Sequence, residues 1–311
     1  MALIACDENE SVTKIPVILD TDIGTDIDDT WALAMLLKSP ELDVKLIVTD
    51  TGDTTYRARI VARMLEIAGR TDVPVGIGIP LESSACRQAA WVAGYDLDGY
   101  PGPILQDGVG ALVDTIMAAA TPVTLISIGP VPNIAAALRR EPAIGRRARF
   151  VGMQGSVRRG YGGRPEIDAE YNVAHFPHAC QEVFSAPWDI TITPVDTCGV
   201  VRLEGDAYRA VRDCQDPLIQ AVIENYRIWT ANREGGEGRE AETRSSILFD
   251  TVAIYLAFSD ELLLMEELGI RVTDDGYTVI DDSAKTVTCA TDWRDLPAFR
   301  RLLVARLTGA G

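Results

Sequence analysis

The 311-residue sequence is poor in basic side chains, with only four lysines and two histidines, and its net charge is −17. Nucleic acids and anionic membrane surfaces bind basic patches, so we expect neither as a partner. No segment approaches the roughly 18 consecutive apolar residues that a membrane-spanning helix requires. The 47% apolar content is enough for a sizeable core, which indicates a globular protein.

The six cysteines are scattered and include no C-x-x-C pair. In a chain of this length, that pattern predicts reduced and mostly buried thiols rather than disulfide bonds or a zinc site. Residues 1–11 carry three acids and only a short apolar piece, which does not match a signal peptide. We therefore expect a cytoplasmic protein.

The most unusual segment is residues 17–33, in which an apolar run leads into five aspartates within ten residues. These are Asp20, Asp22, Asp26, Asp28 and Asp29. No lysine or arginine occurs between Lys14 and Lys38, so no side chain nearby in sequence can neutralise them. Like charges so close together are unfavourable unless a cation lies among them. A hard divalent ion with oxygen ligands is the simplest candidate.

Two simpler explanations of the acidic segment fit less well. A solvated turn with a helix N-cap needs fewer than five acids. An EF-hand loop that begins at Asp20 needs Gly at its sixth position and Glu at its twelfth, where Thr25 and Trp31 stand. We therefore interpret the segment as part of a metal site, with Asp29 or Thr30 as the cap of the next helix.

Short apolar segments alternate with helical ones along most of the chain, which predicts β-α-β units and a parallel sheet. Predicted strands are residues 15–19, 44–49, 73–79, 123–128, 149–153 and 190–195. Predicted helices are residues 56–68, 111–119, 133–140, 177–184, 245–258 and 296–307. Short antiparallel strands are expected within residues 270–289. The predicted fold class is α/β, with an open, mostly parallel sheet, helices on both faces and a single domain over residues 1–311.

Two glycine-rich segments interrupt this alternation. We interpret residues 80–110 as a long excursion near the strand ends rather than a linker. Gly235, Gly236 and Gly238 predict a mobile loop after the helix-rich residues 206–232.

Polar residues follow the predicted strands where ligands bind in open α/β sheets. Asp20 and Asp22 follow the first strand, and Asp50 and Asp53 follow the second. The sequence has neither a Walker-type Gly-Lys loop nor Gly-x-Gly-x-x-Gly after the first strand. A carboxylate-rich crevice suits a cation with a polyhydroxyl substrate better than it suits a phosphate group.

Five segments, in the right order, resemble the motifs of the inosine-uridine-preferring nucleoside hydrolases. They are Asp20-Thr21-Asp22-Ile23-Gly24 with Asp28-Asp29, residues 125–137 (LISIGPVPNIAAA), residues 150–155 (FVGMQG), Ala169-Glu170-Tyr171-Asn172 and Phe249-Asp250. The resemblance extends from about residue 15 to residue 258. It implies calcium-dependent hydrolysis of the N-glycosidic bond of ribonucleosides, which gives ribose and a free base for purine or pyrimidine salvage.

The resemblance also implies roles for individual residues. The implied calcium ligands are Asp22, Asp29, the main-chain carbonyl of Ile128, and Asp250. Asp22 would also deprotonate the calcium-bound water that attacks the sugar, while Asp20 supports the metal loop. Implied substrate contacts are Asp28 and Asn172 at the ribose hydroxyls, Glu170 at the 5′ end, Met153 at the sugar, and Asp53, Phe249 and Trp229. Carboxylates around the sugar would stabilise its oxocarbenium-like transition state.

The sequence departs from the family pattern in four places. Two extra residues separate Asp22 from Asp28-Asp29, so Asp26 is an alternative to Asp22 as ligand or base. Asp53 stands where the family has Asn, which adds a charge beside the metal. Gly163-Arg164 replaces Gly-Asn and, with Arg158 and Arg159 nearby, favours an anionic group at the 5′ end of the substrate. Phe249 replaces the histidine that the family can use as the leaving-group acid.

The replacement at Phe249 leaves the activation of the base open. We interpret His175 and His178 as residues of a loop and a helix start. A tyrosine, a side chain of the glycine-rich loop or aromatic stacking could activate the base instead. Trp229 is a candidate lid residue, as are Tyr226, Trp91 and Tyr95.

Two other functions compete with hydrolysis of nucleosides. Asp20-Thr21-Asp22 after an apolar strand resembles the nucleophile motif of haloacid-dehalogenase-type phosphatases, which also need a lysine further along the chain. A ribosyl-binding protein that lost its leaving-group acid is the third possibility. For a nucleoside hydrolase, the resemblance implies a homodimer or homotetramer.

Overall fold

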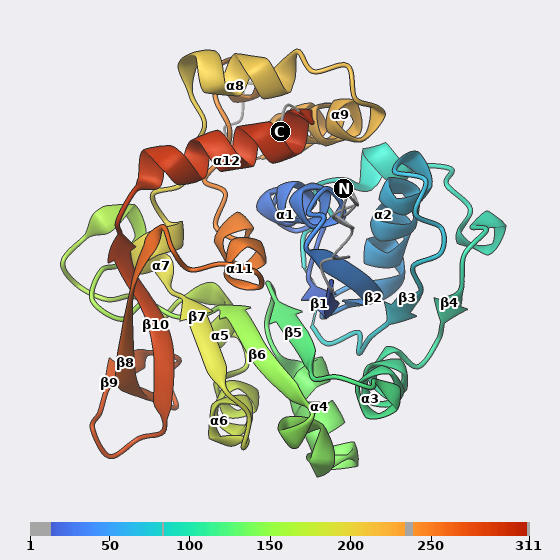
Figure 1. The fold of residues 1–311 in the computed structure, drawn as a ribbon. Coiled ribbons are helices and arrows are strands. Elements are labelled where there is room, and N and C mark those ends of the chain that lie inside the picture. The colour runs from blue at the N-terminus through green and yellow to red at the C-terminus, as the bar shows by residue number, and fades with distance from the viewer. Residues whose placement is uncertain (1–13, 83, 234–238, 310–311) are drawn as a thin grey trace, which may run out of the picture.

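The computed structural model describes residues 14–82, 84–233 and 239–309. Within them, one sheet has the strand order β4-β3-β2-β1-β5-β6-β7-β10-β8-β9 (Figure 1). The strands are β1 (Ile15–Thr21), β2 (Leu42–Thr49), β3 (Val75–Ile77), β4 (Ile104–Leu105), β5 (Val123–Ser127), β6 (Ala148–Met153), β7 (Ile190–Thr193), β8 (Leu263–Val272), β9 (Thr278–Ile280) and β10 (Thr286–Trp293). Neighbours from β4 to β10 pair in parallel, whereas β8 pairs antiparallel with β10 and β9. The predicted α/β class with an open, mostly parallel sheet is confirmed.

Helices cover both faces of this sheet (Figure 1). They are α1 (Asp28–Leu37), α2 (Thr54–Ile67), α3 (Gly108–Ala118), α4 (Pro132–Arg140), α5 (Tyr171–Ala174), α6 (Pro177–Ser185), α7 (Val195–Cys198), α8 (Gly205–Arg212), α9 (Pro217–Ala231), α10 (Glu240–Thr243), α11 (Thr251–Leu256) and α12 (Leu296–Thr308). Helices α1, α2, α9, α11 and α12 contribute to one apolar core. Helices α3, α4 and α6 contribute to a second core.

Strand β1 separates the two cores because successive side chains of a strand point to opposite faces. Val17 and Leu19 are buried in the first core, and Ile18 is buried in the second. A central parallel strand that is covered on both faces is expected to be continuously apolar, as β1 is until it reaches Asp20. Because β1 is held in the core from both sides, Asp20 and the aspartates that follow it must lie at the carboxyl edge of the sheet.

The start of α1 differs from the prediction. Neither Asp29 nor Thr30 caps the helix, because Ile27 occupies the cap position and the cap makes no side-chain hydrogen bond. Asp28 and Asp29 instead lie in the first turn, where the helix dipole favours acids. Their side chains are consequently free to face the carboxyl ends of the strands.

The helix predicted over residues 245–258 is wrong in its first half, since α11 spans only Thr251–Leu256. The N–H groups of Ser245 and Leu248 donate to the carbonyls of Leu203 and Val201 at 3.0 and 2.9 Å. The first half of this segment is apolar because it is buried against residues 201–203, and not because it forms one face of a helix. The shorter helix leaves Asp250 at its N-cap position.

The antiparallel strands expected within residues 270–289 are present, although β8 begins earlier and β10 ends later. All five cysteines of the described residues are free, and Cys180, Cys198 and Cys289 are buried, as predicted. Cys6, the segment 1–11 and the predicted loop at Gly235, Gly236 and Gly238 lie outside the described residues.

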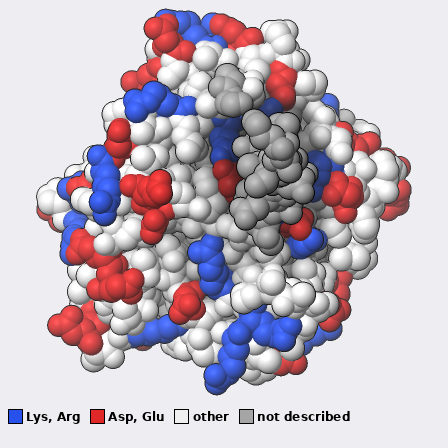
Figure 2. Space-filling model, viewed as in Figure 1, with Lys and Arg blue, Asp and Glu red and all other residues white. Residues whose placement is uncertain are grey.

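Acidic and basic side chains are interspersed over the face of the molecule in Figure 2. Many are neutralised in ion pairs, such as Arg139 with Glu182 and Arg158 with Glu266, both at 2.5 Å. Across the part of the chain that the structure describes, no helix combines the length and the apolar character that a membrane span needs.

Candidate active site

A cavity of about 440 Å³ lies at the carboxyl ends of the parallel strands, where β1, β5 and β6 lead into loops. It is lined by ten of the residues predicted from the sequence, counting the alternative Asp26. These are Asp22, Asp26, Asp28, Asp29, Ile128, Met153, Glu170, Asn172, Phe249 and Asp250. Four further lining residues were not indicated by the sequence: Thr25, Arg87, Tyr161 and Tyr171. Loops that are far apart in the sequence therefore converge on one crevice, although Asp50 and Asp53, which follow β2, do not line it.

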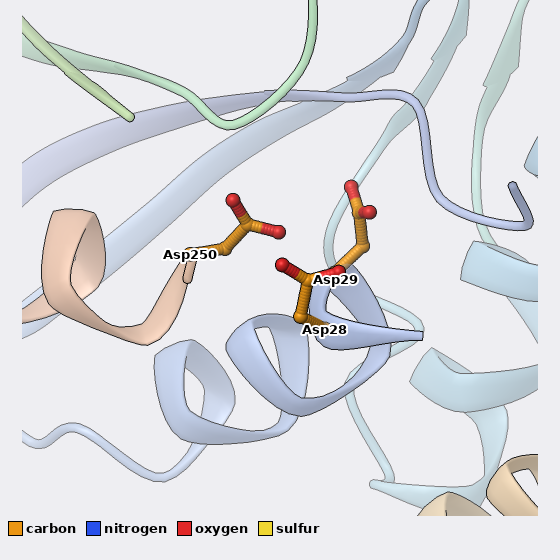
Figure 3. Close-up of side chains that lie close together, drawn as sticks. All are labelled: Asp28, Asp29 and Asp250. Atoms are coloured by element: carbon orange, nitrogen blue, oxygen red, sulfur yellow. The ribbon is translucent and has the colours of Figure 1, made fainter. Parts of the chain in front are cut away.

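Asp28, Asp29 and Asp250 form the tightest acidic group of this cavity (Figure 3). Each offers a carboxylate oxygen, and these oxygens all lie within 4.8 Å of one another. The first two come from the first turn of α1, and the third comes from the start of α11, more than 200 residues later in the sequence. All three residues are buried.

Burial raises the pKa of Asp28, Asp29 and Asp250 well above the ordinary value, because it penalises their charged forms. Repulsion between the neighbouring carboxylates raises these pKa values further. A divalent cation among the oxygens would offset both effects. The donor set consists of oxygens only, which fits a hard ion such as calcium.

Asp22 lines the same cavity but is not one of the three oxygens in the tight group. Its carboxylate lies 4.0 Å from Nη2 of Arg57, which is fully buried on α2. Nη1 of Arg57 also donates to the main-chain carbonyls of Asp22 and Ile23. No basic residue lies near the aspartates in sequence, yet the fold supplies one from the next helix.

Gly24 allows this loop to turn directly above α2. Its φ of 112° belongs to a region that only glycine adopts readily. A Cβ atom there would approach Cε1 of Tyr56 to 2.6 Å. The Tyr56 hydroxyl donates to the Gly24 carbonyl at 3.1 Å, which fixes the loop that carries Asp22 and Asp26.

Asp20 lies inside β1 rather than beyond it, and it does not line the cavity. Its Oδ2 accepts a 2.9 Å hydrogen bond from Nδ2 of Asn133, which also donates to the carbonyl of Thr49. Burial raises the pKa of Asp20 to about 7. Asp20 therefore connects β1, β2 and α4 beneath the cavity.

Asn172 connects two strand ends on the opposite wall. Its Nδ2 donates to the Met153 carbonyl at 2.9 Å and to the Ile128 carbonyl at 3.4 Å. The Glu170 carboxylate accepts from the N–H groups of Gly155, Asn172 and Val173 at 2.9, 2.9 and 3.3 Å. Burial raises the pKa of Glu170 to about 7 despite these hydrogen bonds.

Aromatic side chains form the more open part of the cavity. The rings of Phe249 and Tyr161 meet edge to face, with centroids 6.0 Å apart. The Tyr161 hydroxyl accepts a 3.2 Å hydrogen bond from the N–H of Tyr171, whose own side chain is 37% exposed. A flat ring system could stack or pack against these side chains.

Two predicted substrate contacts do not line the cavity. Asp53 caps α2 by accepting from the Tyr56 N–H at 2.8 Å, and its side chain is exposed. Trp229 is buried, and its Nε1 donates to the Thr25 carbonyl at 3.2 Å. It therefore supports the loop behind the cavity wall.

The arginines considered for an anionic 5′ group also lie outside the cavity lining. Arg158 pairs with Glu266 at 2.5 Å, Arg159 with Asp292 at 3.4 Å, and Arg164 with Asp168 at 2.5 Å. Each positive charge already has an acidic partner on the surface, which weakens the reason for expecting an anionic group there.

The model of the inosine-uridine preferring nucleoside hydrolases matches residues 17–301. The chain belongs to this family. The non-specific ribonucleoside hydrolase RihC of Klebsiella pneumoniae is 31% identical over 227 residues, which cover 69% of this chain and 73% of that protein. The probable uridine nucleosidase 2 of Arabidopsis thaliana is 27% identical over 300 residues, 91% of each chain. As a nucleoside hydrolase, the protein is an N-glycosyl hydrolase.

Solved structures support the fold of this nucleoside hydrolase. The plant nucleoside hydrolase PpNRh1 superposes with a TM-score of 0.81 at 22% identity, covering 95% of this chain and 99% of that one. A purine-preferring ribonucleoside hydrolase from Gardnerella vaginalis gives 0.75 at 21% identity, with 94% and 98% covered. The base preferences given in the names of these relatives differ, so membership of the family alone does not determine which base is released.

Four cavity residues of this nucleoside hydrolase escaped the sequence analysis. Tyr171 lies inside the Ala-Glu-Tyr-Asn segment, between two predicted site residues, and this position is a signal in the sequence for its place in the cavity. Thr25 lies between Gly24 and Asp26, in the segment that is two residues longer than the family motif. Arg87 and Tyr161 lie in irregular segments, and no local pattern there indicates which side chains face inward.

Proposed function

We propose that this nucleoside hydrolase cleaves the N-glycosidic bond of ribonucleosides in a calcium-dependent reaction that gives ribose and a free base. The observation that carries the proposal is the group of buried carboxylates from Asp28, Asp29 and Asp250 at one side of the cavity. Such a group can neutralise a hard cation and surround a sugar that becomes positively charged.

The proposed calcium ligands are Asp22, Asp29, Asp250 and the main-chain carbonyl of Ile128, all of which line the cavity. Asp28 lies close enough to Asp29 and Asp250 to support the same ion. Calcium bound there supplies a Lewis acid that makes a nearby water molecule easier to deprotonate. Because every proposed donor is an oxygen, a soft metal is not expected to compete well.

Asp22 is the proposed general base, which accepts the proton of the water that attacks C1′ of the ribose. Burial raises the pKa of Asp22, which suits a group that must accept a proton, and the guanidinium of Arg57 partly offsets that rise. Asp26 also lines the cavity, but its Oδ1 already accepts a 2.8 Å hydrogen bond from the Ile27 N–H. We therefore retain Asp22 as the base.

Asp28 and Asn172 are proposed to hold the ribose hydroxyls, with Met153 against the sugar. Asn172 is prepared for this role because the carbonyls of Met153 and Ile128 fix its side-chain orientation. The carboxylates around the sugar stabilise the oxocarbenium-like transition state. Glu170 shapes the 5′ end by connecting the loop at Gly155 to the start of α5.

The phosphatase alternative loses its support because Asp20, its nucleophile, is fully buried inside β1 and does not line the cavity. A binding protein without hydrolytic activity is favoured by one observation. Phe249 lines the cavity where the family resemblance expects a histidine, and neither His175 nor His178 lines it.

A nucleoside panel with added calcium separates these functions. We expect free ribose to accumulate with at least one nucleoside, and to stop when a chelator removes calcium. Ligand-induced thermal stabilisation without release of ribose would instead support the binding protein. The base released most rapidly identifies the substrate class.

We also propose a single domain over residues 1–311, a cytoplasmic location and a homodimer or homotetramer, which the family resemblance implies. Light scattering during gel filtration measures the assembly directly. A monomer at micromolar concentration would contradict the proposed assembly without affecting the catalytic proposal.

A further inference from the structure

Arg87 is the only basic residue that lines the main cavity among the residues described, and every other charged residue of the lining is acidic. It also lines an adjoining hollow of about 200 Å³, as do Thr25 and Tyr171. The three residues therefore mark the junction between the two spaces. A substrate whose ribose lies among the carboxylates has its remaining part directed toward less acidic walls.

The main chain at Arg87 is held firmly on both sides. Its N–H donates to the Gly24 carbonyl at 3.2 Å, and its carbonyl accepts from Nδ2 of Asn232 at 3.0 Å. The next residue, Gln88, is fully buried and donates from Nε2 to the Asp26 carbonyl at 2.7 Å. These contacts attach Arg87 to the same loop that carries Asp22.

The Arg87 side chain, in contrast, has no hydrogen bond or ion pair with any residue within the described ranges. Arg57 shows the difference, because its guanidinium donates to five oxygens of the loops around it. Arg87 is half-buried; its charge acts on the Asp26 carboxylate, and within the described ranges its five side-chain N–H donors have no hydrogen-bond acceptor. An arginine with a fixed main chain and free donors is suited to bind a planar acceptor.

The cavity lacks the histidine that the family resemblance expects beside the leaving base. Phe249 has no acidic proton, and His175, which lines the adjoining hollow, has its Nδ1 at 3.0 Å from the Tyr171 carbonyl. The Tyr161 hydroxyl accepts from the Tyr171 N–H and keeps its own proton to donate. Stabilising the negative charge of the departing base is a second way to assist its departure, and it needs only hydrogen-bond donors.

We propose that the guanidinium of Arg87 binds the leaving base and stabilises the negative charge that it acquires as the glycosidic bond breaks. The C1′–N bond breaks and its electron pair stays on the base nitrogen, while the water oxygen forms the new bond to C1′. The water proton passes to Asp22, and the released base anion takes its proton from solvent. This role rests on the proposed nucleoside hydrolysis.

The chemistry of Arg87 also defines the substrate class. A guanidinium only donates hydrogen bonds, so it selects bases that offer acceptor oxygens. Such a base either has a carbonyl oxygen next to the departing nitrogen or spreads the negative charge of that nitrogen onto a more distant carbonyl oxygen. Oxo-bases of the uracil and hypoxanthine type fit this requirement. A riboside with an intrinsically good leaving group, such as 4-nitrophenyl riboside, needs much less help from Arg87.

The test compares Arg87→Met and wild-type enzyme on uridine, inosine and 4-nitrophenyl riboside, with calcium present. We expect kcat/KM for the nucleosides to fall about 100-fold, the usual effect of removing one donor to developing negative charge. The value for 4-nitrophenyl riboside should change little. Arg87→Lys should recover part of the loss, and Arg301→Met, an exposed arginine on α12, should behave as wild type.

Several results would overturn the proposal. An equal loss on all three substrates would mean that Arg87 acts on the sugar or on the fold. If Tyr161→Phe lost kcat/KM on the nucleosides alone, and Arg87→Met kept the wild-type values, the role would belong to the tyrosine. A wild-type enzyme that releases ribose from none of the substrates would refute both this inference and the proposed function, whereas the first two results would leave the proposed function standing.

Discussion

Arg57 holds the main chain at Asp22, because its Nη1 donates hydrogen bonds to the carbonyls of Asp22 and Ile23. Nη2 of the same guanidinium lies 4.0 Å from Oδ2 of Asp22, and Arg57 is fully buried. One side chain of α2 therefore holds the loop that contains the proposed base and places a positive charge beside that base.

Replacing Arg57 by Met should weaken calcium binding about 10- to 100-fold, the usual effect of losing a residue that orients metal ligands. It should also lower the free energy of unfolding by about 3–5 kcal/mol, because a buried charge loses its partner. Calcium titration calorimetry and urea unfolding measure the two effects. Arg59→Met, on the same helix, is the matched control, and unchanged calcium affinity in Arg57→Met would refute this role.

Glu170→Gln should change how stability depends on pH. The pKa of Glu170 is raised to about 7 in the folded protein, so the folded state binds more protons than the unfolded state between about pH 4.5 and 7. Its contribution to stability is therefore complete below pH 4.5 and is lost as the pH rises through 7.

The variant should reduce the fall in unfolding free energy over this range by up to about 1.4 kcal/mol per pH unit. Urea unfolding at several pH values measures the slope, and Glu166→Gln, which changes an exposed acid, serves as the control. Identical slopes in wild type and Glu170→Gln would show that burial does not shift this group.

Phe249→His should increase kcat for nucleosides by about 100-fold, because a protonated imidazole can act as a general acid for the departing base. The gain should disappear as the pH rises above the histidine pKa, since only the protonated form donates. Steady-state kinetics across pH 5–9 measure it, and Phe249→Leu separates the imidazole from the loss of the ring. Tight nucleoside binding without any gain in turnover would favour the binding protein.

The alternation of strands and helices and the acidic segment after the first strand could be predicted because each depends on local pattern. The apolar run 15–19 followed by aspartates indicated the central strand and its functional end, and residue motifs brought Asp250 into the same site. The interval 245–250 was predicted as helix because burial against the residues near Val201 gives the same apolar signal as a helix face.

Other features depend on contacts that sequence spacing does not reveal. Arg57 and Arg87 lie 35 and 65 residues after Asp22, and nothing in their local sequence distinguishes a buried cation from a surface one. Asp53 was a predicted substrate contact because of its position in a motif, and Trp229 because of its aromatic ring. Helix capping and support of the Thr25 loop account for their positions in the fold.

The proposed hydrolysis of nucleosides depends most on a metal site formed by the carboxylates of Asp28, Asp29 and Asp250. The most direct measurement is calcium titration calorimetry of wild type, Asp250→Asn and the exposed control Asp260→Asn, with ribose release measured on the same preparations. We predict that Asp250→Asn loses calcium binding and ribose release together while its circular dichroism spectrum is kept. Full ribose release by chelator-treated wild type, or wild-type calcium affinity in Asp250→Asn, would contradict the account.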